Sequence, residues 1–283
     1  MRRKILITCV LLIVLAGSFI YRVKINPAPS CGGIFNTNLT LGAWGRCWIK
    51  DLWLNWNQTK LPQAMEYQAV ATDKTEQNVK ISTSAAVVIQ QPPESFNLKV
   101  PFTPQAPLAD WDPTFKEACE EASALMVDYF YRGKDFTPEQ ATEEILKLVS
   151  WQQDRWGGHF DLTADQTAEM IKEYFGYKKV EVLTNPSALE IEQQLVQGRP
   201  VIVPAAGQQL GNPYFRSPGP IYHMLVIKGY APGRLFITND PGTKRGEDFL
   251  YSYEVLMNAM HDWDENNILN GAKKIIVVYP APL

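Results

Sequence analysis

The sequence predicts an α+β fold, in which helices come first along the chain and pack on an antiparallel sheet built from the strands that follow. Helix-capping signals and glycine stops mark residues 119–198, and runs rich in Ile, Val and aromatic residues dominate 201–279. Because the two kinds of segment do not alternate, a doubly wound parallel sheet is not expected. The 283 residues include 46% hydrophobic and 20% charged residues, which is the composition of a globular protein.

Residues 1–24 predict an N-terminal membrane anchor or signal peptide. Three basic residues precede an uncharged apolar run of 17 residues, 5–21, which lies at the lower edge of a membrane span and exceeds a typical signal-peptide core. We expect a retained anchor; small residues at 16–18 leave cleavage before Phe19 as the alternative. The basic N-terminus favours a single-pass protein of the cell membrane with its folded part extracytoplasmic, or a secreted protein if the segment is cleaved.

The charge of the folded part argues against one class of partner. Residues 1–50 hold seven basic residues and no acidic one, so the remaining 233 carry 20 basic against 30 acidic residues. Binding to nucleic acid through phosphate contacts needs a basic face. We therefore expect no nucleic-acid partner.

The cysteines are informative if the folded part lies outside the cytoplasm. Cys31 and Cys47 bracket a loop rich in Gly, Asn and Thr, and we expect a disulfide between them, with two unrelated thiols as the alternative. That pairing leaves Cys119 as an unpaired thiol in the folded body. Such a thiol is either deeply buried or functional.

Residues 25–92 predict a small separate region whose fold the pattern does not identify. It is rich in Trp, Asn, Thr and Gln and ends in a strand-like run at 85–89. Prolines concentrated between Pro92 and Pro113 indicate an extended connector, so we place the boundary of the C-terminal domain at 93.

Helices are expected in the first half of that domain, 93–283. A short strand at 96–100 leads into the proline-rich loop, and an apolar helix face follows, ending at Gly133. Capping boxes begin two more helices, and Ser187 begins a fourth that Gly198 stops. The expected ranges of these three are 138–149, 164–175 and 187–197.

Strands are expected in the second half, with one more helix at about 253–260. Their β-branched and aromatic residues are typical of strands in a buried sheet. The expected strands are 201–203, 223–230, 234–238 and 274–279.

Four side chains of this domain supply the groups that cysteine hydrolysis requires: Gln105, Cys119, His223 and Asp240. A thiolate attacks, an imidazole moves the proton, and a carboxylate orients the imidazole. A side-chain amide, together with the backbone N–H of the cysteine, stabilises the oxyanion.

The helix that carries Cys119 has two candidate starts. A start at 112–113 would place Cys119 in the second turn, whereas Glu120 and Glu121 are typical first-turn residues and favour a start near Cys119. Carboxylates that faced the thiol would raise its pKa, so we expect both side chains to point away from it.

His223 and Asp240 are brought together by an expected β-hairpin. The two residues are 17 positions apart, and Pro232-Gly233 marks a turn between their strands. Antiparallel pairing about this turn returns Asp240 to the side of His223.

Four motifs resemble those of the C39-like cysteine peptidase family: KVPFTPQ at 99–105, ACEEAS at 118–123, YHMLVIKGY at 222–230 and NDP at 239–241. The resemblance implies a papain-like fold over roughly 96–279. It also implies that Cys119 is the nucleophile, His223 the base, Asp240 the orienting group and Gln105 the oxyanion donor. Two features depart from the family. Glu120 stands where many members have Gly, and Gln105 lies 14 residues before Cys119, farther than the usual spacing.

The sequence therefore predicts an extracytoplasmic, membrane-tethered thiol peptidase that hydrolyses peptide or isopeptide bonds in a peptide or protein substrate. Glu120 beside the nucleophile motivates an alternative, a peptidase-like binding module without activity. An acyl transferase that uses the same triad is a further alternative. Neither a phosphate-binding loop nor a zinc-ligand spacing is present in the sequence, so no cofactor or metal is expected.

Overall fold

The structure is a computed structural model that describes residues 61–66 and 92–280, all within one compact unit. The N-terminal segment 1–24, the pair Cys31 and Cys47, and the run 85–89 lie outside the described residues. Within the described ranges, no helix is both long enough and apolar enough to cross a membrane.

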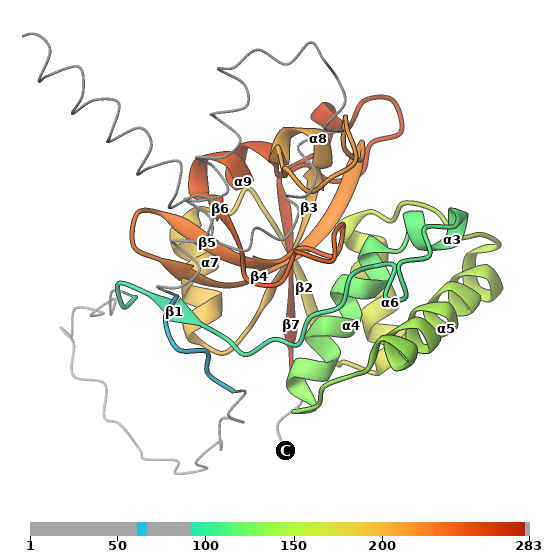
Figure 1. Cartoon of the computed structure of the whole chain (residues 1–283), viewed down its shortest axis with the longest axis horizontal. Coiled ribbons are helices and arrows are strands. Elements are labelled where there is room, and N and C mark those ends of the chain that lie inside the picture. Colours follow the sequence, from blue (N-terminus) through green and yellow to red (C-terminus); the bar gives the residue numbers. More distant parts are fainter. Residues whose placement is uncertain (1–60, 67–91, 281–283) are drawn as a thin grey trace, which may run out of the picture. The chain divides into compact units, whose positions relative to one another are not determined.

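Helices precede most of the sheet, as predicted (Figure 1). Threonine N-caps begin two of them with the capping boxes expected from the sequence, and Ser187 begins a third with a capping box of its own. One of these helices, α5, runs beyond the predicted end at 149, and a left-handed Gly157 stops it. The helices are α3 (Pro113–Lys116), α4 (Cys119–Tyr131), α5 (Pro138–Trp156), α6 (Ala164–Phe175), α7 (Ala188–Val196), α8 (Gly207–Leu210) and α9 (Tyr253–Ala259).

The strands form one sheet in which every pairing of named strands is antiparallel, so the predicted α+β class is confirmed. The order is β2-β7-β3-β4-β5-β6, and β1 pairs separately with β4. The strands are β1 (Phe96–Asn97), β2 (Lys179–Thr184), β3 (Val201–Ala206), β4 (Tyr222–Ala231), β5 (Leu235–Asn239), β6 (Phe249–Ser252) and β7 (Lys274–Tyr279).

The segment 61–66 lies beside β1. The N–H of Met65 donates to the carbonyl of Asn97 at 2.9 Å, and the carbonyl of Met65 accepts from the N–H of Lys99. Lys99 also forms an ion pair with Glu66 at 3.0 Å. Part of the region expected to be separate therefore adds a short bridge to the C-terminal domain.

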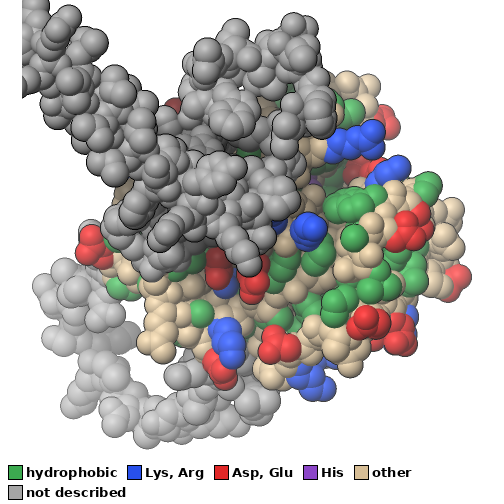
Figure 2. Space-filling model, viewed as in Figure 1, with side chains coloured by type: hydrophobic (Ala, Val, Ile, Leu, Met, Phe, Trp, Pro, Cys, Tyr) green, Lys and Arg blue, Asp and Glu red, His purple; other side chains and the backbone are tan. Residues whose placement is uncertain are grey.

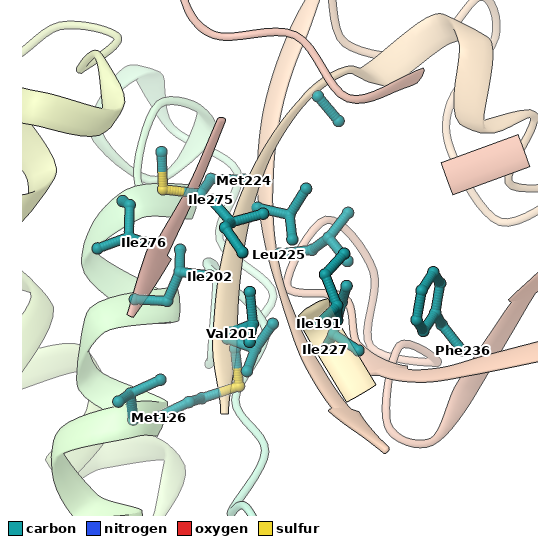
Figure 3. Packing of buried hydrophobic residues seen from close by; sticks show 14 of the residues in the cluster. Met126, Ile191, Val201, Ile202, Met224, Leu225, Ile227, Phe236, Ile275 and Ile276 are labelled. Atoms are coloured by element: carbon teal, nitrogen blue, oxygen red, sulfur yellow. The ribbon is translucent and has the colours of Figure 1, made fainter. Parts of the chain in front are cut away.

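The core lies on both faces of the central strands, because side chains alternate along a strand (Figure 3). On one face they pack toward Met126 of α4, and on the other toward Ile191 of α7. The first set includes Ile202, Met224 and Ile276, and the second Val201, Leu225 and Ile227. The helix pair α4 and α6 and the helix α7 thus cover opposite faces, and the Cys119 helix is fixed against β4.

The surface over the helices carries no single large charged patch on the side shown in Figure 2, where hydrophobic, acidic and basic side chains are interspersed. Several large apolar side chains are exposed, among them Leu108, Trp111 and Leu146. Isolated exposed apolar side chains are ordinary on a protein surface.

Candidate active site

Cys119 is the first residue of α4, which confirms the first-turn position favoured by the sequence. A separate short helix, α3, begins after Asp112, whose carboxylate accepts from the N–H of Phe115 at 2.9 Å. Both candidate starts are therefore real, and the chain leaves the helical path between Lys116 and Cys119. The N-cap of α4 is Ala118, whose side chain cannot accept a hydrogen bond from the first turn.

The thiol of Cys119 is buried and donates to Oε2 of Glu120 at 3.0 Å. Burial first, and then the carboxylate of Glu120, hold the pKa of the thiol well above its usual value. The expectation that both neighbouring acids point away from the thiol is thus wrong for Glu120. The thiol is protonated in this arrangement.

Glu120 is held by a second contact that explains why it turns inward. Its Oε1 accepts from the N–H of Leu162 at 2.8 Å, and the carbonyl of Leu162 accepts from the hydroxyl of Tyr222 at 2.7 Å. This chain of contacts, the Leu162 bridge, joins the start of α4 to the start of β4. Burial, followed by the charges of Glu121 and Asp161, raises the pKa of Glu120 well above its usual value.

His159 contacts the first turn of α4, the helix that begins at Cys119. Its Nε2 is 3.2 Å from Oε1 of Glu121, which is itself fully buried. Burial lowers the pKa of His159, but the hydrogen bond and charge of Glu121 outweigh it, so the pKa is raised overall. Next to it, burial and then the carboxylate of Glu117 raise the pKa of Asp161 to about 6. His159 lies in the loop between α5 and α6.

His223 and Asp240 are paired, as the hairpin argument predicts. Nε2 of His223 lies 2.7 Å from Oδ1 of Asp240, and both side chains are buried. Oδ2 of Asp240 accepts from the amide of Asn212 at 2.9 Å and from the hydroxyl of Tyr251 at 2.6 Å. Burial opposes the charge of Asp240, but His223 and these donors more than compensate, so its pKa is lowered.

A β-bulge in β4 puts the two residues on one face. Next to the turn the register pairs Gly229 with Ile237, whereas beyond Lys228 it pairs Val226 with Asn239, so one residue of β4 is extra. Because side chains alternate, the shifted register sets Asp240 on the face of His223. Without the extra residue, Asp240 would lie on the opposite face.

Gln105 is buried close to Cys119 in the fold, but its amide is already engaged. Nε2 donates to the carbonyl of Phe115 at 2.9 Å and to the carbonyl of Lys116 at 2.8 Å. Since an amide nitrogen carries two hydrogens, both donors are used. An oxyanion role for this side chain would require it to leave one of the two carbonyls.

The sequence therefore identified residues that the fold brings into two groups. One group is Cys119 with Gln105 at the junction of α3 and α4, and the other is His223 with Asp240. In the described part of the chain, no hydrogen bond joins Cys119 to His223. Thiol chemistry at this site needs the Cys119 side chain to turn from Glu120 toward the imidazole.

Sequence reasoning missed several side chains that support these groups. Asn212 and Tyr251 donate hydrogen bonds to Asp240, and Phe215 lies edge-on to the imidazole of His223 at 5.3 Å between ring centres. They come from loops and strands with no spacing that links them to His223. Of the supporting residues, only Glu120 could be singled out from the sequence, because it directly follows the candidate nucleophile. Among the described residues, no three His, Cys, Asp or Glu side chains gather as metal ligands.

The family model described as the Peptidase_C39 like family matches residues 97–267. A protein described as a C39-like peptidase from Bacillus anthracis is 17% identical, with a TM-score of 0.45 over 68% of this chain and 100% of that chain. A fragment of Prevotella intermedia prointerpain A is 12% identical, with a TM-score of 0.46 over 86% of each chain. Active interpain A cysteine protease from Prevotella intermedia is 19% identical, with a TM-score of 0.32 over 54% of this chain and 62% of that chain. No curated protein matches.

Proposed function

Because this chain belongs to the Peptidase_C39 like family, a family of cysteine peptidases, we propose that it is a thiol peptidase that hydrolyses peptide or isopeptide bonds. The observation that carries the proposal is the buried pair of His223 and Asp240 at 2.7 Å, in a fold that also places Cys119 at a helix start. Three residues with these roles are what acyl transfer to a thiol requires.

The proposed reaction begins with proton transfer from the Cys119 thiol to His223. Nε2 of His223 is engaged by Asp240, so Nδ1 is the ring nitrogen that receives the proton. The carboxylate of Asp240 stabilises the imidazolium that forms. The thiolate also gains from the N-terminal end of α4, whose dipole favours negative charge.

The thiolate then attacks the carbonyl carbon of the scissile bond, and the carbonyl oxygen becomes an oxyanion close to the N–H of Cys119. Collapse of this intermediate expels the amine, which takes the proton from His223, and leaves a thioester on Cys119. Water, deprotonated by His223, attacks the thioester. The acid is released and the thiol regains its proton.

We further propose that the catalytic domain is extracytoplasmic and tethered by residues 1–24. The support is the basic cluster followed by the apolar run 5–21.

Hydrolysis of a peptide library by the full chain tests the proposed activity. Cys119→Ala removes the nucleophile, so we expect cleavage to fall to background while the unfolding temperature stays near that of the wild type. Exposed Ser150→Ala, also on a helix, is the control and should leave cleavage unchanged. Cleavage that survives in Cys119→Ala would contradict the proposal.

The hydrogen bond from Cys119 to Glu120 favours one other function, a binding module without activity. A thiol fixed on a buried carboxylate is a poor nucleophile, because the neighbouring negative charge opposes the thiolate. In that case the wild type and Cys119→Ala would both lack cleavage and would bind the same peptides with equal affinity.

A further inference from the structure

We propose that Gln105 is a positioning residue that ends α3 and thereby frees the backbone N–H of Cys119 to bind the oxyanion. The inference deepens the proposed peptidase function and rests on it. It differs from the role implied by the family resemblance, in which the side chain of Gln105 is itself the oxyanion donor.

The first observation is the identity of the two carbonyls that Gln105 holds. In an unbroken α-helix, the N–H of residue i bonds to the carbonyl of residue i−4. Cys119 would therefore bond to Phe115, and Glu120 to Lys116. These are the two carbonyls that accept from Nε2 of Gln105, at 2.9 and 2.8 Å.

The second observation is that two backbone N–H groups at the start of α4, those of Cys119 and Glu120, have no hydrogen-bond acceptor in the described residues. Both residues are buried, with exposed fractions of 3% and 0%. An unpaired N–H in such a place costs free energy. A developing negative charge on a substrate oxygen would be its natural acceptor.

The third observation is that Gln105 is anchored on the other side of the site. Its own backbone N–H donates to the carbonyl of Pro241 at 2.9 Å, and Pro241 directly follows Asp240. Gln105 is itself buried, with 4% of its surface exposed. One residue therefore connects the segment that precedes the nucleophile with the segment that follows the orienting carboxylate.

A covalent aldehyde complex of the full chain tests the assignment without any substitution. Addition of the thiol to a peptide aldehyde gives a hemithioacetal, whose oxygen occupies the position of the oxyanion. We expect a crystal structure of this complex to show that oxygen within hydrogen-bond distance of the N–H of Cys119. The amide of Gln105 should remain on the carbonyls of Phe115 and Lys116.

The variant Gln105→Met provides a second test, because Met has a similar shape but no donor. Without the two hydrogen bonds, α3 can run on into α4, and Cys119 loses its place at the helix start. We expect peptide hydrolysis to fall about 10²–10³-fold. We also expect the pH at which iodoacetamide alkylation of Cys119 reaches half its plateau to rise by about one unit.

Alkylation separates the two roles of Gln105, since displacement of iodide creates no oxyanion. A residue that acted only as an oxyanion donor would reduce hydrolysis and leave the alkylation profile unchanged. Gln140→Met is the matched control, because Gln140 caps the distant helix α5 by accepting from the N–H of Thr137 at 2.9 Å. It should change neither hydrolysis nor alkylation.

The outcomes are distinct. If the aldehyde adds to Cys119 and the Gln105 amide turns to its oxygen, or if Gln105→Met leaves the alkylation profile unchanged, the positioning role is overturned and the peptidase function stands. If the aldehyde does not add to Cys119, the proposed function fails and this inference fails with it. Should Gln105→Met not fold, the wild-type aldehyde complex decides alone.

Discussion

At the scale of single residues, the site combines one carboxyl group whose pKa is lowered, Asp240, with two whose pKa values are raised, Glu120 and Asp161. Asp240 has three donors besides His223, including the N–H of Gly242 at 3.0 Å, and its pKa is lowered although burial opposes its charge. Glu120 accepts from the thiol of Cys119 and the N–H of Leu162, but burial is the largest cause of its raised pKa, as it is for Asp161. The pKa values of the carboxyl groups around the two candidate groups of residues are therefore shifted in opposite directions.

Asp161→Asn should remove a pH-dependent penalty on stability. The pKa of Asp161 is raised from 3.8 to about 6, first by burial and then by the charges of Glu117 and Glu121, which outweigh the favourable charge of His159. Between these values the folded state binds more protons than the unfolded state, so the stability of the wild type falls as pH rises through this window. The variant lacks this fall.

Thermal unfolding at pH 4 and at pH 7 measures this effect. The difference in unfolding temperature between Asp161→Asn and the wild type should grow in favour of the variant from the lower to the higher pH. Asp154→Asn, an exposed aspartate on α5, is the control. An Asp161→Asn difference that is the same at both pH values would contradict this account.

At the scale of elements, the Leu162 bridge and the bulge in β4 relate the helix of the nucleophile to the strand of the base. Tyr222 precedes His223 in β4, and its hydroxyl reaches Leu162, whose N–H is held by Glu120 of α4. The bulge sets which face Asp240 occupies. Neither the Leu162 bridge nor the bulge can be deduced from hydrophobic periodicity. The periodicity locates the strands but does not fix the register in which they pair.

Tyr222→Phe should reduce peptide hydrolysis, whereas the loss of a similar hydrogen bond far from the site should not. It removes one hydroxyl-to-carbonyl hydrogen bond of 2.7 Å, which contributes about 1 kcal/mol. Tyr131→Phe is matched, because it removes a similar bond of 2.8 Å to Val278 near the end of α4. We expect comparable losses of stability in denaturant unfolding and a loss of peptide hydrolysis in Tyr222→Phe alone. Equal activity in the two variants would show that the bridge plays no part in the site.

Gly229→Ala should destabilise the domain by about 1–3 kcal/mol, because the new methyl group has no room. A Cβ at this position would lie 2.3 Å from the carbonyl oxygen of Phe96 and 2.8 Å from the Cα of Asn97, both backbone atoms of β1. Gly158→Ala is the control, since its Cβ would meet only the side chain of Phe160, which is exposed. Denaturant unfolding measures both, and equal stability of the two variants would refute the packing argument.

At the scale of the whole molecule, the sequence predicts the helices, whose ends are marked by nearby capping residues. It does not predict features that depend on contacts between residues far apart in the sequence. Capping residues such as Thr163 placed the helices correctly. The strands β2 and β6 were not anticipated, since β2 is partly exposed and β6 is only four residues long. Cys119, His223 and Asp240 could be selected by chemistry and order along the chain, but the inward turn of Glu120 depends on Leu162, 42 residues away.

The contacts of segment 61–66 could not be predicted from the sequence for the same reason. Its hydrogen bonds to 97–99 span more than 30 residues of sequence, and nothing in its own composition points to a partner. A boundary based on prolines therefore marks where the chain is extended without showing what the preceding residues contact.

The central claim, a functional pair of Cys119 and His223, is tested most directly by the pH dependence of Cys119 alkylation in the full chain. Iodoacetamide labelling is followed by mass spectrometry of the peptide that contains Cys119, in the wild type, His223→Ala and the control His261→Ala. In the structure Cys119 faces Glu120, so the account requires the thiol to turn toward His223. In that arrangement it predicts a plateau reached well below pH 8 that is lost in His223→Ala and kept in His261→Ala. A simple titration at or above the ordinary thiol value of about 8.5, indifferent to His223, would contradict it.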